Sequence, residues 1–420
     1  MKRQFERQPL PKTAQNAKDV QKERSTMENF TYYIPTKVFF GRGQLSQLGP
    51  AALEYGDKAL LVYYGNASEK EQAIVQAVKA ELDKNGVAYF PFTNVQPNPQ
   101  IASVKEGNAI ARTNRVDLII AIGGGSAIDC AKGICATALY EGDPWEAVKD
   151  ASLISKTIPL ACVSTMAATG TEMDTAAVIS NAAINEKINF FCEAVRPKFA
   201  VLDPEYTFSV PPYQTACGGV DILSHAMEVY FSNTPETAFQ NNMAEALMKT
   251  VIKYTPVAYR DPTNYEARAN LMWASPWAIN CFLMWGKDID WSIHNIEHEV
   301  SAYYNVTHGA GMAAITPSWM EYLLDEETVD NFVSYAVNVW NVPADGDKMT
   351  IAKAGIEKTR AFYAELGMPK NLRELGVKED TFEAMAKGAI VNNDWRGQGV
   401  IKAIKPLAYV DMLNIIKMAY

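Results

Sequence analysis

Three of the four histidines in this 420-residue chain lie close together, in the stretch HNIEHEVSAYYNVTH at residues 294–308. The stretch opens with H-x-x-E-H, a pattern in which two histidines can bind zinc while a glutamate activates water for peptide hydrolysis. His294 and His298 are four residues apart and would share one face of a helix. The spacing therefore raises the question of whether a metal bound here hydrolyses peptides or serves another reaction.

A second pair with the same spacing precedes the histidine-rich stretch. Asp221 and His225 lie in GGVDILSHAMEVY, and His308 follows in NVTHGAG, where Asn, Thr and Gly indicate a turn or a new helix start. Four of these five acidic and histidine side chains could converge on one divalent ion between two helices. Ligands of these types, without cysteine, suit Fe(II), Zn(II), Co(II) or Mn(II).

A glycine-rich turn precedes both pairs. The segment LIIAIGGGSAIDCAKGI is typical of an apolar strand, a tight turn and a helix. Glycines let the backbone approach a ligand closely, and the helix start offers free N–H groups and a positive dipole end to a pyrophosphate. This predicts phosphate binding by Gly123, Gly124, Gly125 and Ser126. The turn lacks the G-x-G-x-x-G spacing, so a strand-to-helix turn without a ligand is the alternative.

A metal site and a nucleotide cradle in one chain favour hydride transfer over proteolysis. A peptidase needs no dinucleotide, whereas a metal ion facing a nicotinamide can polarise an alcohol or carbonyl oxygen. Glu297 of the H-x-x-E-H pattern is therefore expected to be solvated or hydrogen-bonded, not catalytic.

The elements that must position these residues change in character along the chain. Five apolar runs ending at Gly, Pro or polar residues predict strands between about 30 and 205, namely KALLVYYG, VAYFPF, VDLIIAIGGG, TIPLACVST and KFAVLDP. Helical segments alternate with them, which predicts a mainly parallel sheet with helices on both faces. After Pro211 long amphipathic segments follow. We therefore predict an α/β, Rossmann-like nucleotide-binding domain at 27–210 and an all-α metal- and substrate-binding domain at 211–420.

The composition narrows the partners and the compartment. A formal net charge of -9 argues against nucleic acid or an anionic membrane as a partner. No apolar run reaches eighteen residues, and six cysteines without a C-x-x-C pattern favour a reduced, cytoplasmic protein. Residues 1–26 are polar and charged and lack the apolar segment of a secretory signal, so they are expected to form a disordered leader.

Together these motifs resemble the iron-containing (group III) alcohol dehydrogenase family, in particular its butanol dehydrogenase and aldehyde reductase subgroup. The resemblance runs from about Phe30 to the C-terminus. The matching segments are VFFGRGQLSQLG, PNP, AIGGGSAIDCAKGI, AATGTEM, FAVLDPEYTFSVPP, GGVDILSHAMEVY and DWSIHNIEHEVSAYYNVTHGAGMAAITPSWM. It implies an NAD(P)-linked, Fe(II)- or Zn(II)-dependent homodimer that interconverts short-to-medium primary alcohols and aldehydes.

The resemblance also assigns roles to individual residues. It places the metal ligands at Asp221, His225, His294 and His308, and it leaves His298 near the nicotinamide, where an imidazole can relay a proton. A structural hydrogen-bonding role for His298 is the alternative. Besides the glycine turn, the implied cofactor-binding residues are Asn98, Asp129, Thr165, Thr169 and Lys187. Asp129 could equally brace its helix.

The end of the first predicted strand bears on the coenzyme. Gly65, Asn66 and Ser68 follow this strand, and the first carboxylate comes only at Glu69, which favours NADP over NAD. Four tryptophans at 273, 277, 285 and 291 precede the ligand helix and predict either an apolar wall beside the metal or ordinary core packing.

Three other functions remain possible at this point. A related fold serves polyol and glycerol dehydrogenases, and also dehydroquinate synthase, a lyase that uses NAD and zinc. The lyase needs basic side chains for a phosphorylated acid, and no Lys/Arg cluster flanks residues 294–308. A zinc peptidase is the outsider from another class.

Overall fold

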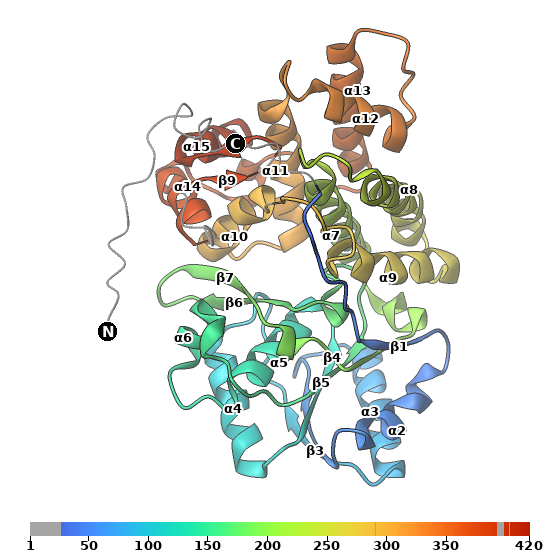
Figure 1. Cartoon of the computed structure of the whole chain (residues 1–420). Helices are drawn as coiled ribbons and strands as arrows, with labels where there is room; N and C mark the ends of the chain where they lie inside the picture. Colours follow the sequence, from blue (N-terminus) through green and yellow to red (C-terminus); the bar gives the residue numbers. More distant parts are fainter. Residues whose placement is uncertain (1–26, 290, 393–398, 403) are drawn as a thin grey trace.

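The structure, a computed structural model, describes residues 27–289, 291–392, 399–402 and 404–420. The leader predicted at residues 1–26 lies outside these described residues. Figure 1 shows a sheet with flanking helices in the blue-to-green first half and a helical second half that runs from yellow-green to red. No described helix is both long and apolar enough to cross a membrane.

Six parallel strands form the central sheet, in the order β1-β8-β5-β4-β2-β3. The strands are β1 (Lys37–Phe40), β2 (Lys58–Val62), β3 (Ala88–Phe92), β4 (Leu118–Gly123), β5 (Leu160–Ser164) and β8 (Phe199–Leu202). All except β1 lie in the five predicted runs. Four of these strands are largely buried and read as continuous apolar stretches, whereas β3 is an edge strand with only Phe92 buried. β1 escaped prediction because it is a four-residue edge strand whose side chains are partly exposed.

Helices cover both faces of this sheet. The helices of the first half are α2 (Leu48–Leu53), α3 (Glu69–Lys84), α4 (Ile101–Asn114), α5 (Gly125–Thr137) and α6 (Pro144–Lys149). Alternate β4 side chains point to opposite faces: Ile119 joins the core under α4, α5 and α6, whereas Ile120 joins the core under α2 and α3. The predicted Rossmann-like fold of the first half is confirmed.

A hairpin that the sequence did not predict lies between the sheet and the helical half (Figure 1). Its antiparallel strands are β6 (Ala176–Asn181) and β7 (Glu186–Phe191), and β7 packs against α10. The turn contains Asn185 at φ +50° and has no Asn-Gly or Asp-Gly pair, the strongest short hairpin signal. The two strands also mix polar and apolar residues, so neither their composition nor the turn indicated a hairpin.

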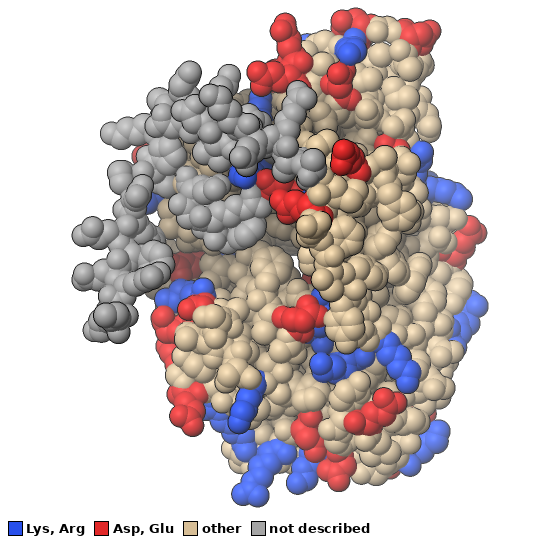
Figure 2. Space-filling view, viewed as in Figure 1, with Lys and Arg blue, Asp and Glu red and all other residues tan. Residues whose placement is uncertain are grey.

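The second half is built from helices around one large core. These are α7 (Pro212–Tyr230), α8 (Ala238–Arg260), α9 (Tyr265–Ile279), α10 (Ser292–Tyr304), α11 (His308–Leu323), α12 (Val329–Trp340), α13 (Lys348–Glu365), α14 (Phe382–Val391) and α15 (Tyr409–Met418). The predicted helical fold is confirmed, apart from a two-residue strand pair, β9 (Ile401–Lys402) and β10 (Pro406–Leu407). On the coloured part of the face in Figure 2, basic side chains are interspersed with acidic ones and form no broad basic patch.

Candidate active site

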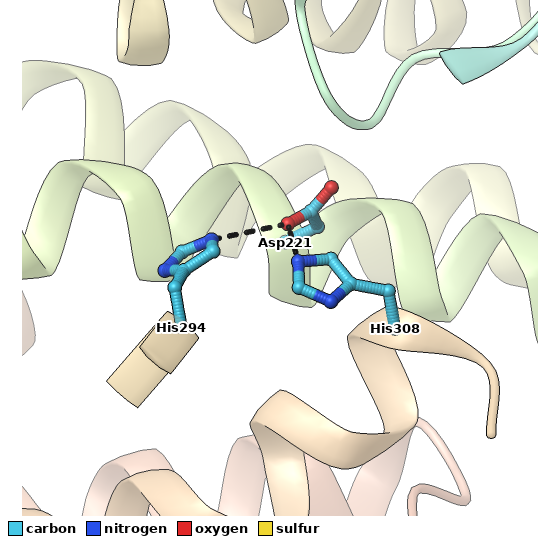
Figure 3. Close-up of side chains that lie close together, drawn as sticks. All are labelled: Asp221, His294 and His308. Atoms are coloured by element: carbon cyan, nitrogen blue, oxygen red, sulfur yellow. Dashed lines mark ion pairs between the residues drawn. The ribbon is translucent and has the colours of Figure 1, made fainter. Parts of the chain in front are cut away.

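Three helices bring one carboxylate and three imidazoles together. Asp221 and His225 come from α7, His294 from α10 and His308 from the first position of α11. Figure 3 shows the rings of His294 and His308 on either side of Asp221. The Oδ1 atom of Asp221 lies 3.7, 3.8 and 3.4 Å from the Nε2 atoms of the three histidines in chain order.

These separations suit ligands of one metal ion. Two ligand atoms bound tetrahedrally at about 2.1 Å from an ion lie about 3.4 Å apart. Asp221 Oδ1 and His294 Nε2 are buried and have no hydrogen-bond partner among the described residues. Leaving such atoms unsatisfied costs about 1–3 kcal/mol each, which a cation between them would offset. The four predicted ligands therefore fit a divalent metal.

The protonation of the site also favours a cation. Burial lowers the pKa of His225 to about 3, so its imidazole is neutral and keeps a lone pair for a metal. Burial alone would raise the pKa of Asp221, but His225 and His308 hold it well below its usual range. The site thus presents an ionised carboxylate next to a neutral imidazole. Burial lowers the pKa of the other two histidines, but Glu228 and Asp221 raise that of His294 to about 9 and Glu297 raises that of His308, so protons and a metal ion would compete for these two rings.

Two glutamates pair with the Nδ1 atoms of His294 and His308, the ring nitrogens that do not face Asp221. Glu228 Oε2 pairs with His294 Nδ1, and Glu297 Oε2 pairs with His308 Nδ1. Glu297 is hydrogen-bonded, one of the two roles expected for it, but it is fully buried and not solvated. Glu228 was missed, although its place seven residues after Asp221 puts both on one face of α7. The glutamate of H-x-x-E-H therefore pairs with a histidine.

The glycine turn lies at the carboxyl end of the sheet. Gly123 ends β4 opposite Ser164 of β5, and the strand order reverses between β4 and β2, where doubly wound sheets bind ligands. Gly123 has φ +150°. A Cβ on Gly125 would lie 2.6 Å from Thr169 Cγ2, so that glycine permits the close approach of the next loop.

One cleft connects the glycine turn to the metal residues. Its predicted lining residues are Asn98, Gly125, Ser126, Asp129, Thr169, Lys187, His225, His294, His298 and His308. Thr165 and Gly123 instead line a smaller adjoining cavity with Tyr64 and Glu71. The structure thus brings the nucleotide and metal residues to one site.

Several predicted cofactor residues have structural partners of their own. Asp129 accepts hydrogen bonds from Thr171 Oγ1 at 2.7 Å and from the Val178 N–H at 3.0 Å, so it braces the hairpin while lining the cleft. Lys187 Nζ lies 3.4 Å from Glu297 Oε2. Among Gly65, Asn66 and Ser68, none lines either of these cavities.

Ser68 caps the following helix and brings a carboxylate to this region. Its hydroxyl accepts from the Glu71 N–H and donates to Glu71 Oε2 at 2.7 Å. Glu71 lines the small cavity beside Tyr64 and Gly123. Glu71 lies in the first turn of α3 and not next to the strand end, so the residues that directly follow the strand do not reveal this carboxylate.

His298 faces the same cleft from α10. Its ring lies 6.3 Å from that of His294 and 5.7 Å from that of His308, centroid to centroid. Burial holds the pKa of His298 well below its usual value, so the ring is neutral. Its Nδ1 has no partner among the residues that the structure describes. A neutral imidazole of this kind can accept a proton at one nitrogen and donate from the other.

Of the two predictions for the four tryptophans, an apolar wall beside the metal or ordinary core packing, the first holds for Trp291. Trp291 lines the cleft and meets the rings of His225 and His294 edge-on. The tryptophans at 273, 277 and 285 instead line a surface groove, because α9 and the loop after it turn their aromatic side chains away from the cleft. Other apolar residues that line the cleft, which the sequence did not indicate, include Val178, Phe191, Ile279 and Met284.

Comparison with known proteins gives consistent matches over both halves. The family model "Iron-containing alcohol dehydrogenase" matches residues 35–204, and the model of the C-terminal part of the Fe-containing alcohol dehydrogenase family matches 215–420. NADH-dependent butanol dehydrogenase A of Clostridium acetobutylicum is 48% identical over 394 residues, 94% of this chain and 100% of that protein. NADPH-dependent aldehyde reductase YqhD of Escherichia coli is 34% identical, over 86% of this chain and 92% of its own.

A solved structure agrees with these sequence matches. NADH-dependent butanol dehydrogenase A of Thermotoga maritima superposes with a TM-score of 0.87 at 34% identity, covering 94% of this chain and 99% of that chain. The likeness extends through both the sheet and the helical half.

Proposed function

The chain belongs to the iron-containing alcohol dehydrogenase family, and from this membership we infer that Asp221 and three histidines hold the metal with which it acts. The protein is an NAD(P)-linked alcohol dehydrogenase and aldehyde reductase that uses a divalent metal, as predicted. The zinc peptidase interpretation is thereby excluded. We propose short-to-medium primary alcohols and aldehydes as its substrates.

One observation carries the site assignment. The Nε2 atoms of His225, His294 and His308 lie within 3.8 Å of a single carboxylate oxygen, inside a cleft that the glycine turn also lines. A metal bound there would face a dinucleotide bound on the same cleft. The apolar residues Ile279, Met284 and Trp291 would contact an alkyl chain more favourably than a polyol.

The metal, the glycine turn, His298 and the apolar side of the cleft each have a separate role in the proposed reaction. When bound, the metal polarises the substrate oxygen and offsets the negative charge that develops on it. The turn at 123–126 binds the pyrophosphate of NAD(P)H, which supplies the hydride. His298 passes a proton between the substrate oxygen and solvent, and the apolar side of the cleft orients the alkyl chain.

The substitution Asp221→Ala tests this assignment. The variant should lose its metal on dialysis and lose more than about 100-fold in kcat/KM for butyraldehyde, since removal of even an outer partner of a metal ligand costs about 10–100-fold. The control is Asp203→Asn, which changes a carboxylate that caps the turn after β8. An Asp221→Ala enzyme that keeps its metal and its activity would contradict the assignment.

The residues after the first predicted strand favoured NADP as the coenzyme, and no finding tests that preference directly. Two observations favour NADH: the carboxylate of Glu71 beside the small cavity, and the NADH dependence stated for the two clostridial butanol dehydrogenases. A carboxylate at this place can hold a ribose hydroxyl and repel a 2′-phosphate. We propose that NADH is the better coenzyme, and Glu71→Gln should narrow the NADH/NADPH ratio of kcat/KM by about 10-fold or more. Glu69→Gln is the control, and an unchanged ratio in the Glu71 variant would contradict the proposal.

We further propose that the protein is a cytoplasmic homodimer. All six cysteines are free, which fits a reducing compartment. Phe239 and Trp273 line an open apolar groove beside the edge strand β1, and Phe40 of β1 packs against Trp273 with ring centroids 5.4 Å apart. Apolar patches next to an open strand edge commonly mark contacts between subunits.

A further inference from the structure

The three histidines whose Nε2 atoms face Asp221 differ in the partners of their Nδ1 atoms. His294 and His308 each pair through Nδ1 with a buried glutamate, whereas His225 Nδ1 has no partner among the described residues. Glu228 is 4% exposed and Glu297 is fully buried. Placing carboxylates in such positions is costly unless each has a specific partner.

Glu228 ties the metal residues of two helices together. Its Oε2 pairs with His294, and its Oε1 accepts the backbone N–H of Ile293 at 2.7 Å, in the first turn of α10. The first N–H groups of a helix have no partner within the helix. One side chain of α7 therefore both satisfies the start of α10 and orients the histidine that follows.

Glu297 is held from three sides. Ser301 Oγ donates to its Oε1, His308 pairs with its Oε2, and Lys187 Nζ lies 3.4 Å from the same Oε2. A Cβ at Gly311 would lie only 2.7 Å from Glu297 Cγ, so glycine at that position leaves room for this side chain.

Lys187 reaches this cluster from outside the helical half. It belongs to β7 of the hairpin, which packs against α10, and its side chain is only 4% exposed. The family resemblance assigned Lys187 to the coenzyme, yet its ammonium group is directed at a carboxylate that holds a metal-facing histidine. The hairpin thus contributes a charge to the helical metal site.

Given the metal site proposed above, we propose that Glu297 is a positioning residue that fixes His308 for metal binding, and that Lys187 acts through Glu297. A carboxylate that accepts the Nδ1–H of a histidine fixes the tautomer, leaving the Nε2 lone pair for the metal, and sets the ring orientation. Lys187 and Ser301 in turn hold the carboxylate in place. The β6–β7 hairpin therefore carries part of the machinery that binds the metal.

Metal affinity, not turnover, is the readout that tests this. Wild-type, Glu297→Ala and Glu297→Gln enzymes are stripped of metal and titrated with Co(II) and Zn(II) against a competing chelator. Glu297→Ala should weaken binding by about 10–100-fold and alter the visible Co(II) spectrum. Glu297→Gln should weaken it less, because an amide oxygen still accepts the Nδ1–H.

The matched control is Glu299→Gln on the same helix. Glu299 is also buried, but it faces α14, where Asn392 donates to it at 2.9 Å. Its variant should bind metal within about twofold of wild type, since it has no contact with the metal-facing histidines. Equal metal affinity and equal Co(II) spectra for wild type and both Glu297 variants would overturn the proposal.

A double-mutant cycle tests the part played by Lys187. Lys187→Met should weaken metal binding in the wild-type background and leave it unchanged in Glu297→Ala, because Lys187 acts through Glu297. The same loss in both backgrounds would show that Lys187 acts independently and would overturn this part. If Glu297→Ala fails to fold by circular dichroism, the cycle is run with Glu297→Gln, in which the Lys187→Met effect should shrink. Failure of the proposed metal site itself is recognised separately, because wild type would then not bind one equivalent of metal.

Discussion

At the residue scale, buried ionisable side chains have clearly different roles. His298 lies beside the metal residues, but among the described residues only the other three histidines pair with Asp221 Oδ1. All four histidines could be singled out from the sequence because histidine is rare in this chain. Their spacing alone could not distinguish the metal ligands from the proton relay. Glu228 was missed because a glutamate on an apolar helix face carries no motif of its own.

The variant His298→Ala separates relay from ligand. We expect it to keep its metal while kcat falls by about 100- to 10,000-fold, the range typical for loss of a general acid–base group. His308→Ala, in contrast, should lose the metal. Metal analysis alongside steady-state kinetics makes the comparison, and metal loss in both variants would assign His298 to the ligand set instead.

Glu299 gives the stability a pH dependence of known sign. Burial raises its pKa from 4.5 to about 7, so folding favours the protonated acid. The stabilisation from this group is complete below about pH 4.5 and is lost as the pH rises through about 7. Glu299→Gln should therefore unfold with a free energy about 1–3 kcal/mol higher than wild type at pH 8 and nearly equal at pH 4.5. Urea unfolding at both pH values measures this, and a difference independent of pH would contradict it.

At the element scale, what could be predicted followed the length and polarity of each run. The five predicted strands were visible because each lies in an apolar run ended by Gly, Pro or polar residues, although β3 is an edge strand with only Phe92 buried. The β6–β7 hairpin was not, because its strands mix polar and apolar residues and its turn depends on Asn185 at positive φ. Asp129 braces that hairpin through Val178, and Lys187 of the hairpin reaches Glu297, so missing the hairpin also hid the contact between Lys187 and the partner of His308.

The turn before α5 offers a test at this scale. In Gly125→Ala the new Cβ would lie 2.6 Å from Thr169 Cγ2, so the loop after β5 must move away from the turn. We expect KM for the coenzyme to rise about 10-fold or more, and Tm to fall, since overpacking costs about 1–3 kcal/mol. Adding Thr169→Ala removes the clashing atoms and should recover most of the Tm. No recovery would mean that the strain lies elsewhere.

At the scale of the whole molecule, the cleft between the sheet and the helical half defines the enzyme. Its lining comes mainly from the hairpin, from the first turn of α5 and from α7, α9, α10 and α11, which no local pattern in the sequence could place together. The tryptophans illustrate the limit: all four lie within nineteen residues, but only Trp291 reaches the cleft. Which side of a helix lines a cavity depends on how that helix packs against its neighbours, and the sequence of the helix alone does not show this packing.

The apolar groove outside the cleft, which Phe239 and Trp273 line, allows a test of the proposed dimer. Phe239 is 63% exposed and lines the groove, so Phe239→Arg would place a charge, twice by symmetry, in a dimer interface. Light scattering after size exclusion should give about twice 46.4 kDa for wild type and about 46.4 kDa for the variant. Leu139→Arg, at an exposed leucine outside the groove, should stay dimeric. A monomeric wild type would contradict the proposal.

The location of the metal tests the whole account most directly. Anomalous diffraction from crystals of the Fe(II)- or Zn(II)-loaded enzyme, recorded at the absorption edge of the metal, places the ion without reference to activity. We expect one strong peak at about 2.0–2.2 Å from a carboxylate oxygen of Asp221 and from Nε2 of His225, His294 and His308. A peak bound instead through His298 and Glu297, or one outside the cleft that the glycine turn lines, would contradict the account.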